Sequence, residues 1–404
     1  MSDIPRASSL PHEKHVLVAG AGVAGPLVCY WLKQAGYLPM LIEKSPFLRQ
    51  GGHAVDIRGI AVQIAKKMSI YEEICCQRTQ IATTRYVDTE GKTLMEQSGE
   101  AAGFRQGEEV EIVRGDLIAI IMSTIKDVPR YFQQSITAIR NNDDSVEVDF
   151  NDGKKGRFGL LIGCDGLHSS IRKRVFTEDE VQLNNLGFYI SVFNHPNYLQ
   201  LRQSEIIFKR YHKLVHVSSD KDADRARTGF LFRSKKTLTD KRNIAAQKQF
   251  LREHFQHAGW ETDTLLEYMD KATELYFDSI SQIKMPYWTK GRVALVGDAG
   301  YCASPLSGQG TSLALVGAYI LAGELKAAAG NHAIAFERYN SLMRPFVEAN
   351  QDFGAFISQT YLVDDAETDS KQVDENRMIM EKLQAASGAM CLPEYEDMCR
   401  ALTS

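Results

Sequence analysis

Apolar runs alternate with glycine-rich turns at the start of the chain. Residues 15–19 (HVLVA) are apolar and rich in β-branched side chains, which predicts a short buried strand. The glycines of residues 20–25 (GAGVAG) follow at once and open a helical pattern that stops near Gly36, and residues 37–42 form a second apolar run that ends at Glu43. A strand, a helix and a strand with short connections predict a parallel βαβ unit with a right-handed crossover.

Further apolar runs predict strands of the same layer. In residues 159–166 (GLLIGCDG), an apolar run leads directly to Asp165. Residues 292–296 (RVALV) form another apolar run, and Asp298 follows it. An acid that follows a buried parallel strand lies at the carboxyl edge of the sheet, which is where open α/β sheets bind their ligands. We therefore expect Glu43, Asp165 and Asp298 to meet at one edge.

The pattern changes in the second half of the chain. Between Leu183 and Phe232, apolar and polar positions alternate in aromatic-rich runs, which favours an antiparallel sheet with one covered face. Residues 243–273 have helical periodicity, and an amphipathic helical tail follows Ala329 with an acidic break at residues 364–367. The tail is expected to pack across the other two layers.

Composition narrows the class of protein. A chain of 404 residues exceeds one ordinary hydrophobic core, and 47 basic against 51 acidic residues give a net charge of -4. This balance disfavours nucleic acid and anionic membranes as partners, so a small molecule is the expected partner and a monomer is possible. The seven scattered cysteines have no CxxC spacing, which indicates neither a disulfide framework nor a zinc site and fits a reducing cytoplasm. The first dozen residues lack a signal-peptide core, and no run of about 18 apolar residues is present.

The GAGVAG turn predicts nucleotide binding. Gly20 permits a tight turn, Gly22 lets the backbone approach a pyrophosphate, and Gly25 allows close packing of helix on strand. Glu43 stands 18 residues beyond Gly25, where an acid accepts hydrogen bonds from ribose hydroxyls and disfavours a ribose 2'-phosphate. The alternative is a merely structural glycine turn, and the motif alone does not separate FAD from NAD.

Residues 297–311 favour flavin. Asp298 can accept hydrogen bonds from ribityl hydroxyls, and the loop of Pro305 to Thr311 brings flexible backbone to the ligand. The amides of Gly310 and Thr311, at the start of a helix, can face negative charge at the pyrimidine end of a flavin.

Each of the other candidate cofactor-binding residues also has a simpler structural interpretation. The polar loop from Arg49 to Arg58, which contains Asp56, also fits a solvated turn. A lone arginine in the place of Arg114 is more often a surface ion-pair residue, and Asp165 with Gly166 is also a turn signal. The histidines lack metal-binding spacing and are interpreted as surface or packed residues, and no GxSxG or Ser-His-Asp pattern supports acyl transfer.

The segments GAGVAG with Glu43, GCDGLHSSIR and GDAGYCASPLSGQG, in this order, resemble the group A flavoprotein monooxygenases, the para-hydroxybenzoate hydroxylase-like family. The resemblance covers about residues 14–345. Within the family, the GGHAVDIRG loop and the additional C-terminal helix are most similar to the tetracycline destructases. The resemblance implies that Glu43 holds the adenosine ribose, Asp298 the ribityl chain, and that Asp165 and Gly166 touch both cofactors. Arg49, Asp56 and Arg114 match further flavin- and nicotinamide-side positions.

The expected fold is therefore α/β, with a Rossmann-like FAD-binding layer, an antiparallel-sheet substrate domain and a C-terminal helical segment. The expected FAD-binding domain comprises residues 1–82, 98–180 and 276–330, the substrate domain residues 83–97 and 181–275, and the bridging C-terminal helices residues 331–404. The predicted cofactor-binding residues are Gly20, Gly22, Val23, Ala24, Gly25, Glu43, Lys44, Arg49, Asp56, Arg114, Asp165, Gly166, Asp298, Pro305, Gly308, Gly310 and Thr311.

The resemblance also implies the chemistry. NADPH or NADH reduces FAD, dioxygen adds at flavin C4a, and the hydroperoxide passes an electrophilic oxygen to an electron-rich phenol or enol, so no catalytic side chain is assigned. A pocket for a tetracycline is expected to be wide and aromatic with a few polar anchors. The predicted substrate residues are Phe188, Tyr189, Phe193, Tyr211, Phe230, Phe232 and Arg233. Each of these aromatic residues is alternatively a core residue.

Three hypotheses for the function follow. The first is an FAD monooxygenase that oxidises and inactivates tetracyclines. The second keeps the enzyme class and changes the substrate to another phenolic or polyketide compound. The third is a flavin-binding module without catalytic activity.

Overall fold

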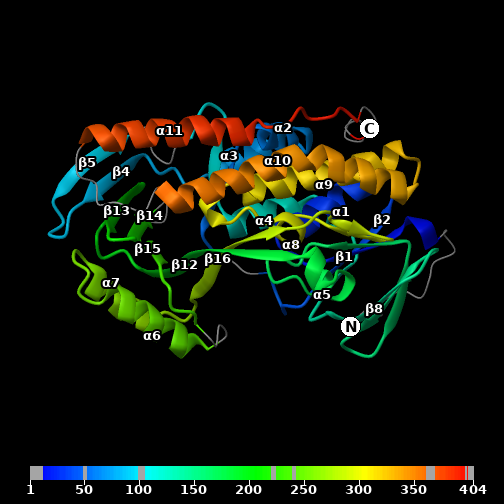
Figure 1. The fold of residues 1–404 in the computed structure, drawn as a ribbon, viewed down its shortest axis with the longest axis horizontal. Helices are drawn as coiled ribbons and strands as arrows, with labels where there is room; N and C mark the ends of the chain where they lie inside the picture. The colour runs from blue at the N-terminus through cyan, green and yellow to red at the C-terminus, as the bar shows by residue number, and fades with distance from the viewer. Residues whose placement is uncertain are drawn as a thin grey trace.

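The protein consists of two sheet layers that share a helical cover (Figure 1). The computed structural model describes residues 12–48, 52–98, 105–219, 224–238, 243–360, 369–395 and 398. Arg49 and the acidic break at residues 364–367 lie outside the described residues.

A six-stranded sheet forms the first layer, in the order β17-β18-β11-β1-β2-β7. Its central strands are almost wholly apolar, and their side chains are buried in the main hydrophobic core. All neighbours pair in parallel except β17 with β18. The strands are β1 (His15–Ala19), β2 (Leu38–Glu43), β7 (Arg130–Phe132), β11 (Leu160–Gly163), β17 (Thr289–Lys290) and β18 (Val293–Leu295).

The predicted strand–helix–strand unit is present. Helix α1 (Ala24–Gln34) starts inside the glycine turn and connects β1 to β2. The register places Ala19 beside Ile42 and Gly163, and Gly163 beside Leu295. The carboxyl ends of these strands therefore form one rim, which we call the FAD rim after the cofactor expected there.

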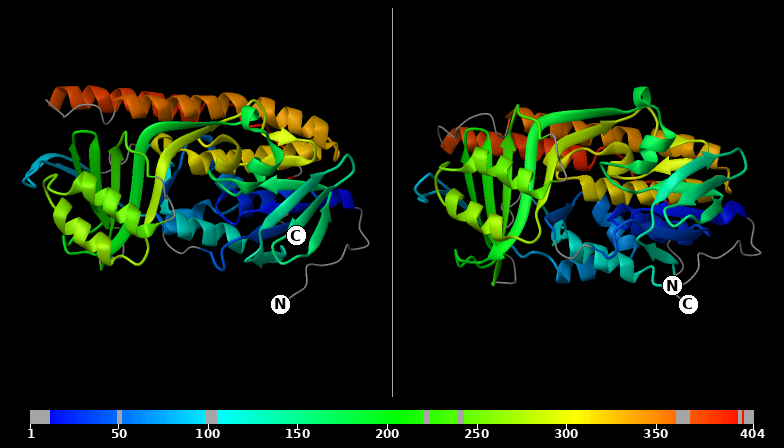
Figure 2. Two further views of the ribbon diagram at one scale, coloured as in Figure 1. Left: turned by 60° about the horizontal axis from the view of Figure 1, so that its bottom comes forward. Right: turned by 90° about the horizontal axis from the view of Figure 1, so that it is seen from below.

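A seven-stranded sheet forms the second layer, in the order β16-β12-β15-β14-β13-β4-β5. Neighbours are antiparallel except β13 and β4, which pair in parallel. Residues 276–284 were expected in the FAD-binding domain, but they form β16 of this sheet, and the long strands β12 and β16 run between the two layers (Figure 2). The strands are β4 (Thr83–Val87), β5 (Thr93–Ser98), β12 (Gln182–Pro196), β13 (Ser204–Arg210), β14 (Lys213–Ser219), β15 (Arg225–Arg233) and β16 (Tyr276–Lys284).

The two faces of this second sheet have different partners. Helices α6 (Ile244–Phe255) and α7 (Thr262–Lys271) cover one face and bury an aromatic core there. The opposite face turns toward the first layer: Leu306 packs against the cluster that Phe188 and Ile280 form on that face. Leu306 lies in the loop of residues 305–311, which we call the flavin loop after its expected ligand. We call this second face the cleft face.

Smaller elements complete the layers. Helix α9 (Gly310–Ala327) is buried along nearly its whole length and packs on α1. The remaining strands are β3 (Ala54–Ile57) with β6 (Val110–Val113), and β8 (Ile136–Asn141), β9 (Val146–Phe150) and β10 (Lys155–Phe158). The remaining helices are α2 (Ile60–Lys67), α3 (Tyr71–Cys76), α4 (Arg114–Ser123), α5 (Ser170–Val175) and α8 (Asp298–Tyr301), with the short 3-10 helices His12–Lys14, Glu178–Glu180 and Pro305–Ser307.

The C-terminal helices lie along both layers (Figure 2). Helix α10 (His332–Thr360) packs on α9 and is joined to β16 by a side-chain amide: Gln351 Nε2 donates to the carbonyl of Ile283 at 2.8 Å. Helix α11 (Asp369–Ser387) packs on α10, where Asn350 Nδ2 donates to the carbonyl of Ala386 at 3.1 Å. Within the described ranges, no helix combines the length and the apolar character needed to cross a membrane.

Candidate active site

The glycine turn at the FAD rim leaves no room for side chains at two positions. Gly20 has φ +109°, and a Cβ atom there would lie 2.5 Å from the carbonyl oxygen of Cys164. A Cβ atom at Gly25 would lie 1.8 Å from the carbonyl oxygen of Gly20. At Gly22, a Cβ atom would lie 3.2 Å from the guanidinium of Arg114. Glycine is therefore required for the turn to close, and the turn lies beside a cation suited to a phosphate.

Glu43 holds this turn in place. Its carboxylate accepts hydrogen bonds from the backbone N–H of Ala21 at 2.7 Å and from that of Ser45 at 2.8 Å. These two bonds fix the carboxylate at the end of β2, while the neighbouring Lys44 is exposed. Val23 and Ala24 lie where α1 begins, so the first amides of the helix face the rim.

Asp298 lies at the end of β18, in a recess of the rim. The side chain is accessible, yet desolvation by the surrounding protein raises its pKa, against the opposing charges of Arg114 and Arg172. A Cβ atom at Gly310 would lie 3.8 Å from Asp298 Oδ1, so the carboxylate lies next to the N-terminus of α9. The acid, the cation and the helix start predicted from separate segments meet here.

The loop between α8 and α9 carries an unsatisfied buried amide. Gln309 is fully buried, and within the described part of the chain neither its amide oxygen nor its amide nitrogen has a hydrogen-bond partner. Gly308, in the left-handed conformation, has open space around the position of a Cβ atom, and Pro305 and Thr311 flank the same loop. Buried amides of native proteins are nearly always hydrogen-bonded. A ring that offers both donors and acceptors, such as the pyrimidine ring of a flavin, fits this loop.

Asp165 has a structural task. Its carboxylate accepts hydrogen bonds from the backbone N–H of Ser170 at 2.6 Å and of Ile171 at 3.2 Å, and from the Ser169 hydroxyl. These bonds cap helix α5. The part of this motif that is open to a cofactor is Gly166, because a Cβ atom there would meet no atom within 4 Å.

Asp56 and Arg114 are held in place by different contacts. Asp56 pairs with Arg58 at 3.0 Å and with Arg105 at 3.7 Å, so it belongs to an ion-pair network on β3 rather than to the turn. Arg114 begins α4 and receives its position through a backbone hydrogen bond to the carbonyl of His53 at 3.1 Å. Of these two, only Arg114 reaches the glycine turn.

Sequence reasoning missed Arg172. The run of three basic residues in α5 suggests a surface helix end, but Arg172 is buried. Its guanidinium donates to the carbonyls of Ala299 and Leu167, both at 2.6 Å, and thereby ties α5 to α8. The signal that could have found it is its place three residues after the cap serine, on the inward side of a short helix.

The predicted substrate residues divide between the two faces of the second sheet. Tyr189, Phe193, Phe230 and Phe232 are core residues that pack under α6 and α7. Tyr211 lies in an exposed hairpin turn, with 63% of its surface accessible. Tyr189, Phe193, Phe230 and Phe232 therefore lie on the other side of the sheet from the cleft face, since alternation along a strand turns successive side chains to opposite faces. A substrate contact by these four residues or by Tyr211 stays a prediction.

Phe188 and Arg233 do lie on the cleft face, where the guanidinium stands 5.6 Å from the ring centroid. Sequence reasoning missed other side chains of this face. Tyr276 of β16 lies 5.6 Å, between ring centroids, from His53 of the first layer. Desolvation lowers the pKa of His53 to about 4, and the charges of Arg114 and Arg227 act in the same direction. His53 thus stands between Arg114 and the cleft face.

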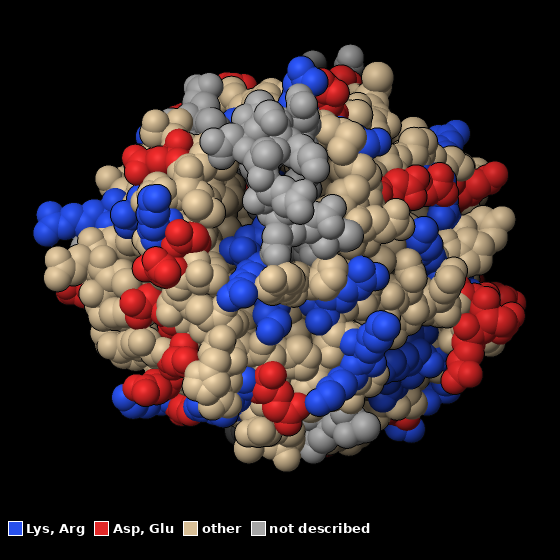
Figure 3. All heavy atoms as spheres, turned by 60° about the vertical axis from the view of Figure 1, so that its left-hand side comes forward, with Lys and Arg blue, Asp and Glu red and all other residues tan. Residues whose placement is uncertain are grey.

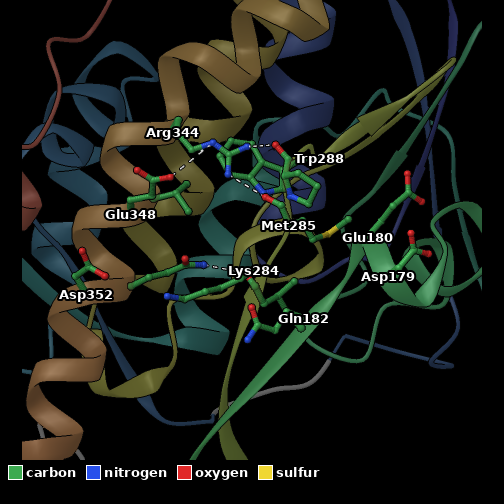
Figure 4. Close-up of a pocket in the computed structure, with 13 residues that line it drawn as sticks. Asp179, Glu180, Gln182, Lys284, Met285, Trp288, Arg344, Glu348 and Asp352 are labelled. Atoms are coloured by element: carbon green, nitrogen blue, oxygen red, sulfur yellow. Dashed lines mark hydrogen bonds and ion pairs between the residues drawn. The ribbon is translucent and has the colours of Figure 1, made fainter.

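Two other features bear on ligands. Among the residues that the structure describes, no group of three or more His, Cys, Asp or Glu side chains is placed to hold a metal ion. A separate surface cavity of about 440 Å³ lies between β16 and α10 (Figure 4). In its wall, the guanidinium carbon of Arg344 lies 4.1 Å from the centroid of the Trp288 ring. This cavity contains none of the predicted cofactor residues.

The chain matches known flavoproteins along nearly its whole length. Residues 13–353 match the FAD binding domain family. A flavin-dependent monooxygenase from Legionella longbeachae serogroup 1 (strain NSW150) is 53% identical over 383 residues, which are 94% of this chain and 98% of that protein. A flavin-dependent monooxygenase from an unknown prokaryotic organism is 52% identical over 386 residues, covering 96% of this chain and all of the relative. The chain therefore belongs to the family of FAD-dependent monooxygenases, which confirms the prediction made from the three motifs.

The solved structures that resemble this chain include two tetracycline destructases. The tetracycline destructase Tet(55) is 50% identical, with a TM-score of 0.90 over 96% of this chain and all of that one. The tetracycline destructase Tet(51) is 48% identical, with a TM-score of 0.87 over 95% of this chain and all of that one. Klebsiella pneumoniae HpxO in complex with FAD and uric acid has the same fold, with a TM-score of 0.74 at 20% identity.

Proposed function

We propose that this protein uses NAD(P)H and dioxygen to oxidise and thereby inactivate tetracyclines. The observation that carries the proposal is the similarity to Tet(55), at 50% identity across all of that chain. This similarity spans the cleft face as well as the FAD rim. A similarity restricted to the FAD motifs would support only the enzyme class, because the motifs are shared whatever the substrate.

The residues of the FAD rim have separate tasks in this proposal. When bound, FAD supplies the redox chemistry and the activation of dioxygen. The glycine turn and Arg114 receive the pyrophosphate, Glu43 the adenosine ribose, and Asp298 the ribityl hydroxyls. The side-chain amide of Gln309 forms hydrogen bonds with the pyrimidine ring, and the N-terminus of α9 stabilises negative charge at the pyrimidine end of the flavin.

The cleft face orients the substrate and excludes water. Its apolar side chains lie against the flavin loop through Leu306, so a flat molecule held there lies beside the rim. Exclusion of water protects a reactive oxygen donor until the substrate is in place. On the end of the molecule that carries this sheet, Lys and Arg side chains gather in the middle of the face (Figure 3), which favours the approach of anionic molecules.

The test measures NADPH and NADH oxidation in air by the FAD-loaded protein, with tetracycline, with a phenolic acid, or with nothing added. We expect tetracycline to accelerate coenzyme oxidation and mass spectrometry to find an oxygen atom added to the drug. The treated drug should no longer inhibit bacterial growth. Acceleration by the phenolic acid alone would point to an aromatic hydroxylase, and a yellow protein without turnover would point to a binding module. Either result overturns the proposal.

A further inference from the structure

A single row of residues crosses the cleft face from the flavin side to a half-buried ion pair. Tyr276 pairs with Val192, Val192 with Gly229, and Gly229 with His216, on the neighbouring strands β16, β12, β15 and β14. Residues that pair directly lie on the same face of a sheet. Three strand spacings separate the ends of the row, so Tyr276 and His216 stand about 14 Å apart along the sheet.

The middle of this row is a low apolar shelf. A Cβ atom at Gly229 would be only in ordinary contact with His216, 3.9 Å from its Cβ and 4.0 Å from its Nδ1, so glycine leaves the imidazole uncovered. Val192 is the only side chain between Gly229 and Tyr276 in the row. Ile190 and Leu231 in the adjoining row are partly buried and apolar. The surface suits a flat, fused-ring molecule.

One end of the shelf lies at the FAD rim. The centroid of the Tyr276 ring is 5.6 Å from that of the His53 ring. The backbone carbonyl of His53 accepts the hydrogen bond that positions Arg114. A ring system on the shelf therefore has one edge near the flavin side and the opposite edge near His216.

The far end of the shelf is an imidazole–carboxylate pair. His216 Nε2 lies 2.6 Å from Glu205 Oε2, and the Thr84 hydroxyl donates to Glu205 Oε1 at 2.5 Å. Both oxygens of the carboxylate are thus engaged within the sheet. His216 Nδ1 has no hydrogen-bond partner among the described residues, and a third of the side chain, 33%, is accessible. Accessibility and orientation leave Nδ1 for a ligand.

The charges around His216 favour the protonated form of its imidazole. Burial acts to lower the pKa of His216, but the Glu205 carboxylate outweighs burial and the pKa is raised. The other charged groups that face His216 are Glu111 of β6, which acts in the same direction as Glu205, and Arg227 of β15, which opposes it. Arg105 faces the Glu205 carboxylate from the first layer. A protonated imidazole offers Nδ1–H as a charged donor.

We propose that the Glu205–His216 pair positions the substrate by donating a hydrogen bond from His216 Nδ1 to an enolate or phenolate oxygen of a fused-ring molecule on the shelf. This inference rests on the proposed function and names the side chain that anchors the substrate. An oxygen that is ionised makes its ring electron-rich, which is the form that an electrophilic oxygen donor attacks. His216 is a positioning residue: by holding one edge of the rings, it determines which carbon faces the flavin side.

The experiment compares His216→Gln and Glu205→Gln with the wild type, using tetracycline as the probe. His257→Gln is the matched control, because His257 also pairs with a carboxylate, Asp263 at 3.0 Å, but in an exposed loop beside α7. We expect KM for tetracycline to rise about tenfold or more in His216→Gln, the effect of one lost charged hydrogen bond, with a smaller change in kcat. Less drug should be oxygenated per NADPH consumed. The flavin content of both variants should match that of the wild type, and both variants should still unfold cooperatively.

The pH profile separates positioning from a structural role. In the wild type, kcat/KM should fall as pH rises through the pKa of His216, and this limb should disappear in His216→Gln. Unchanged KM, coupling and pH profile in two folded variants would overturn the inference. Tetracycline binding is also measured directly, by its effect on the flavin absorbance of the oxidised enzyme. If the wild type binds but does not oxidise the drug, the proposed function fails while weaker binding by both variants still supports the anchor.

Discussion

Replacing Glu43 with glutamine is expected to weaken FAD binding in a protein that still folds. The Glu43 carboxylate accepts two backbone hydrogen bonds, from Ala21 at 2.7 Å and from Ser45 at 2.8 Å. Glutamine keeps one acceptor oxygen and turns an NH2 group toward the other N–H. One of the two charge-assisted bonds is therefore lost, and the two donors face each other.

The expected magnitude follows from that loss. A hydrogen bond to a charged group contributes about 1.5–3 kcal/mol. Ala21 belongs to the turn that approaches the cofactor, and the same carboxylate is the proposed acceptor for the ribose hydroxyls, so the loss should appear in cofactor affinity. We expect the Kd for FAD to increase about tenfold to a hundredfold.

The assay titrates FAD into apoprotein and follows the quenching of flavin fluorescence. Lys44→Gln is the matched control, since this neighbouring side chain is exposed and its removal should leave the Kd unchanged. Thermal unfolding of both apoproteins checks that the variants fold. A folded Glu43→Gln protein with wild-type affinity for FAD would refute the reasoning, because the carboxylate would then contribute nothing to the turn or to the ribose.

Three other changes test the rim and its surroundings. Asp298→Ala should lower flavin occupancy, read from the ratio of visible to ultraviolet absorbance, while circular dichroism stays native; a fully yellow, active variant contradicts this role. Gly20→Ala places a Cβ 2.5 Å from the Cys164 carbonyl and should abolish FAD binding or folding, whereas Gly36→Ala, with φ +82° and open space, should lose only about 1–2 kcal/mol in urea unfolding; equal losses would show that backbone strain alone matters. The pKa of His53 falls on folding from 6.5 to about 4, so the unfolded chain binds more protons and stability should decline as pH falls across this interval. His53→Gln should flatten that decline in thermal unfolding, and an unchanged slope would exclude this histidine as its source.

The FAD rim could be predicted because its information is local. A glycine turn between an apolar strand and a helix, or an acid directly after a buried run, needs no knowledge of distant residues. The parallel arrangement then brings Glu43 and Asp298 to one edge without further assumptions. Asp165 shows the limit of this logic, since the serines that follow it engage its carboxylate as a helix cap.

The cleft face could not be predicted in the same way. Alternation in β12 and β15 defines two faces, but only tertiary packing decides which of them α6 and α7 cover. Four of the predicted aromatic residues, Phe230 and Phe232 among them, belong to the covered face, where the helix layer packs on a bulky core. The row that joins Tyr276 to His216 depends on the register of strands that are distant in sequence.

The place of β4 and β5 in the seven-stranded sheet limits how the enzyme can be recombined. Residues 99–181 separate these two strands from the rest of the sheet in the sequence, and β4 pairs with β13 while β5 forms the edge. A chimera that exchanges one continuous segment with a relative separates native neighbours and pairs β13 with a foreign strand. Transfer of drug specificity between such enzymes consequently requires two coordinated exchanges, one on each side of the central FAD segments.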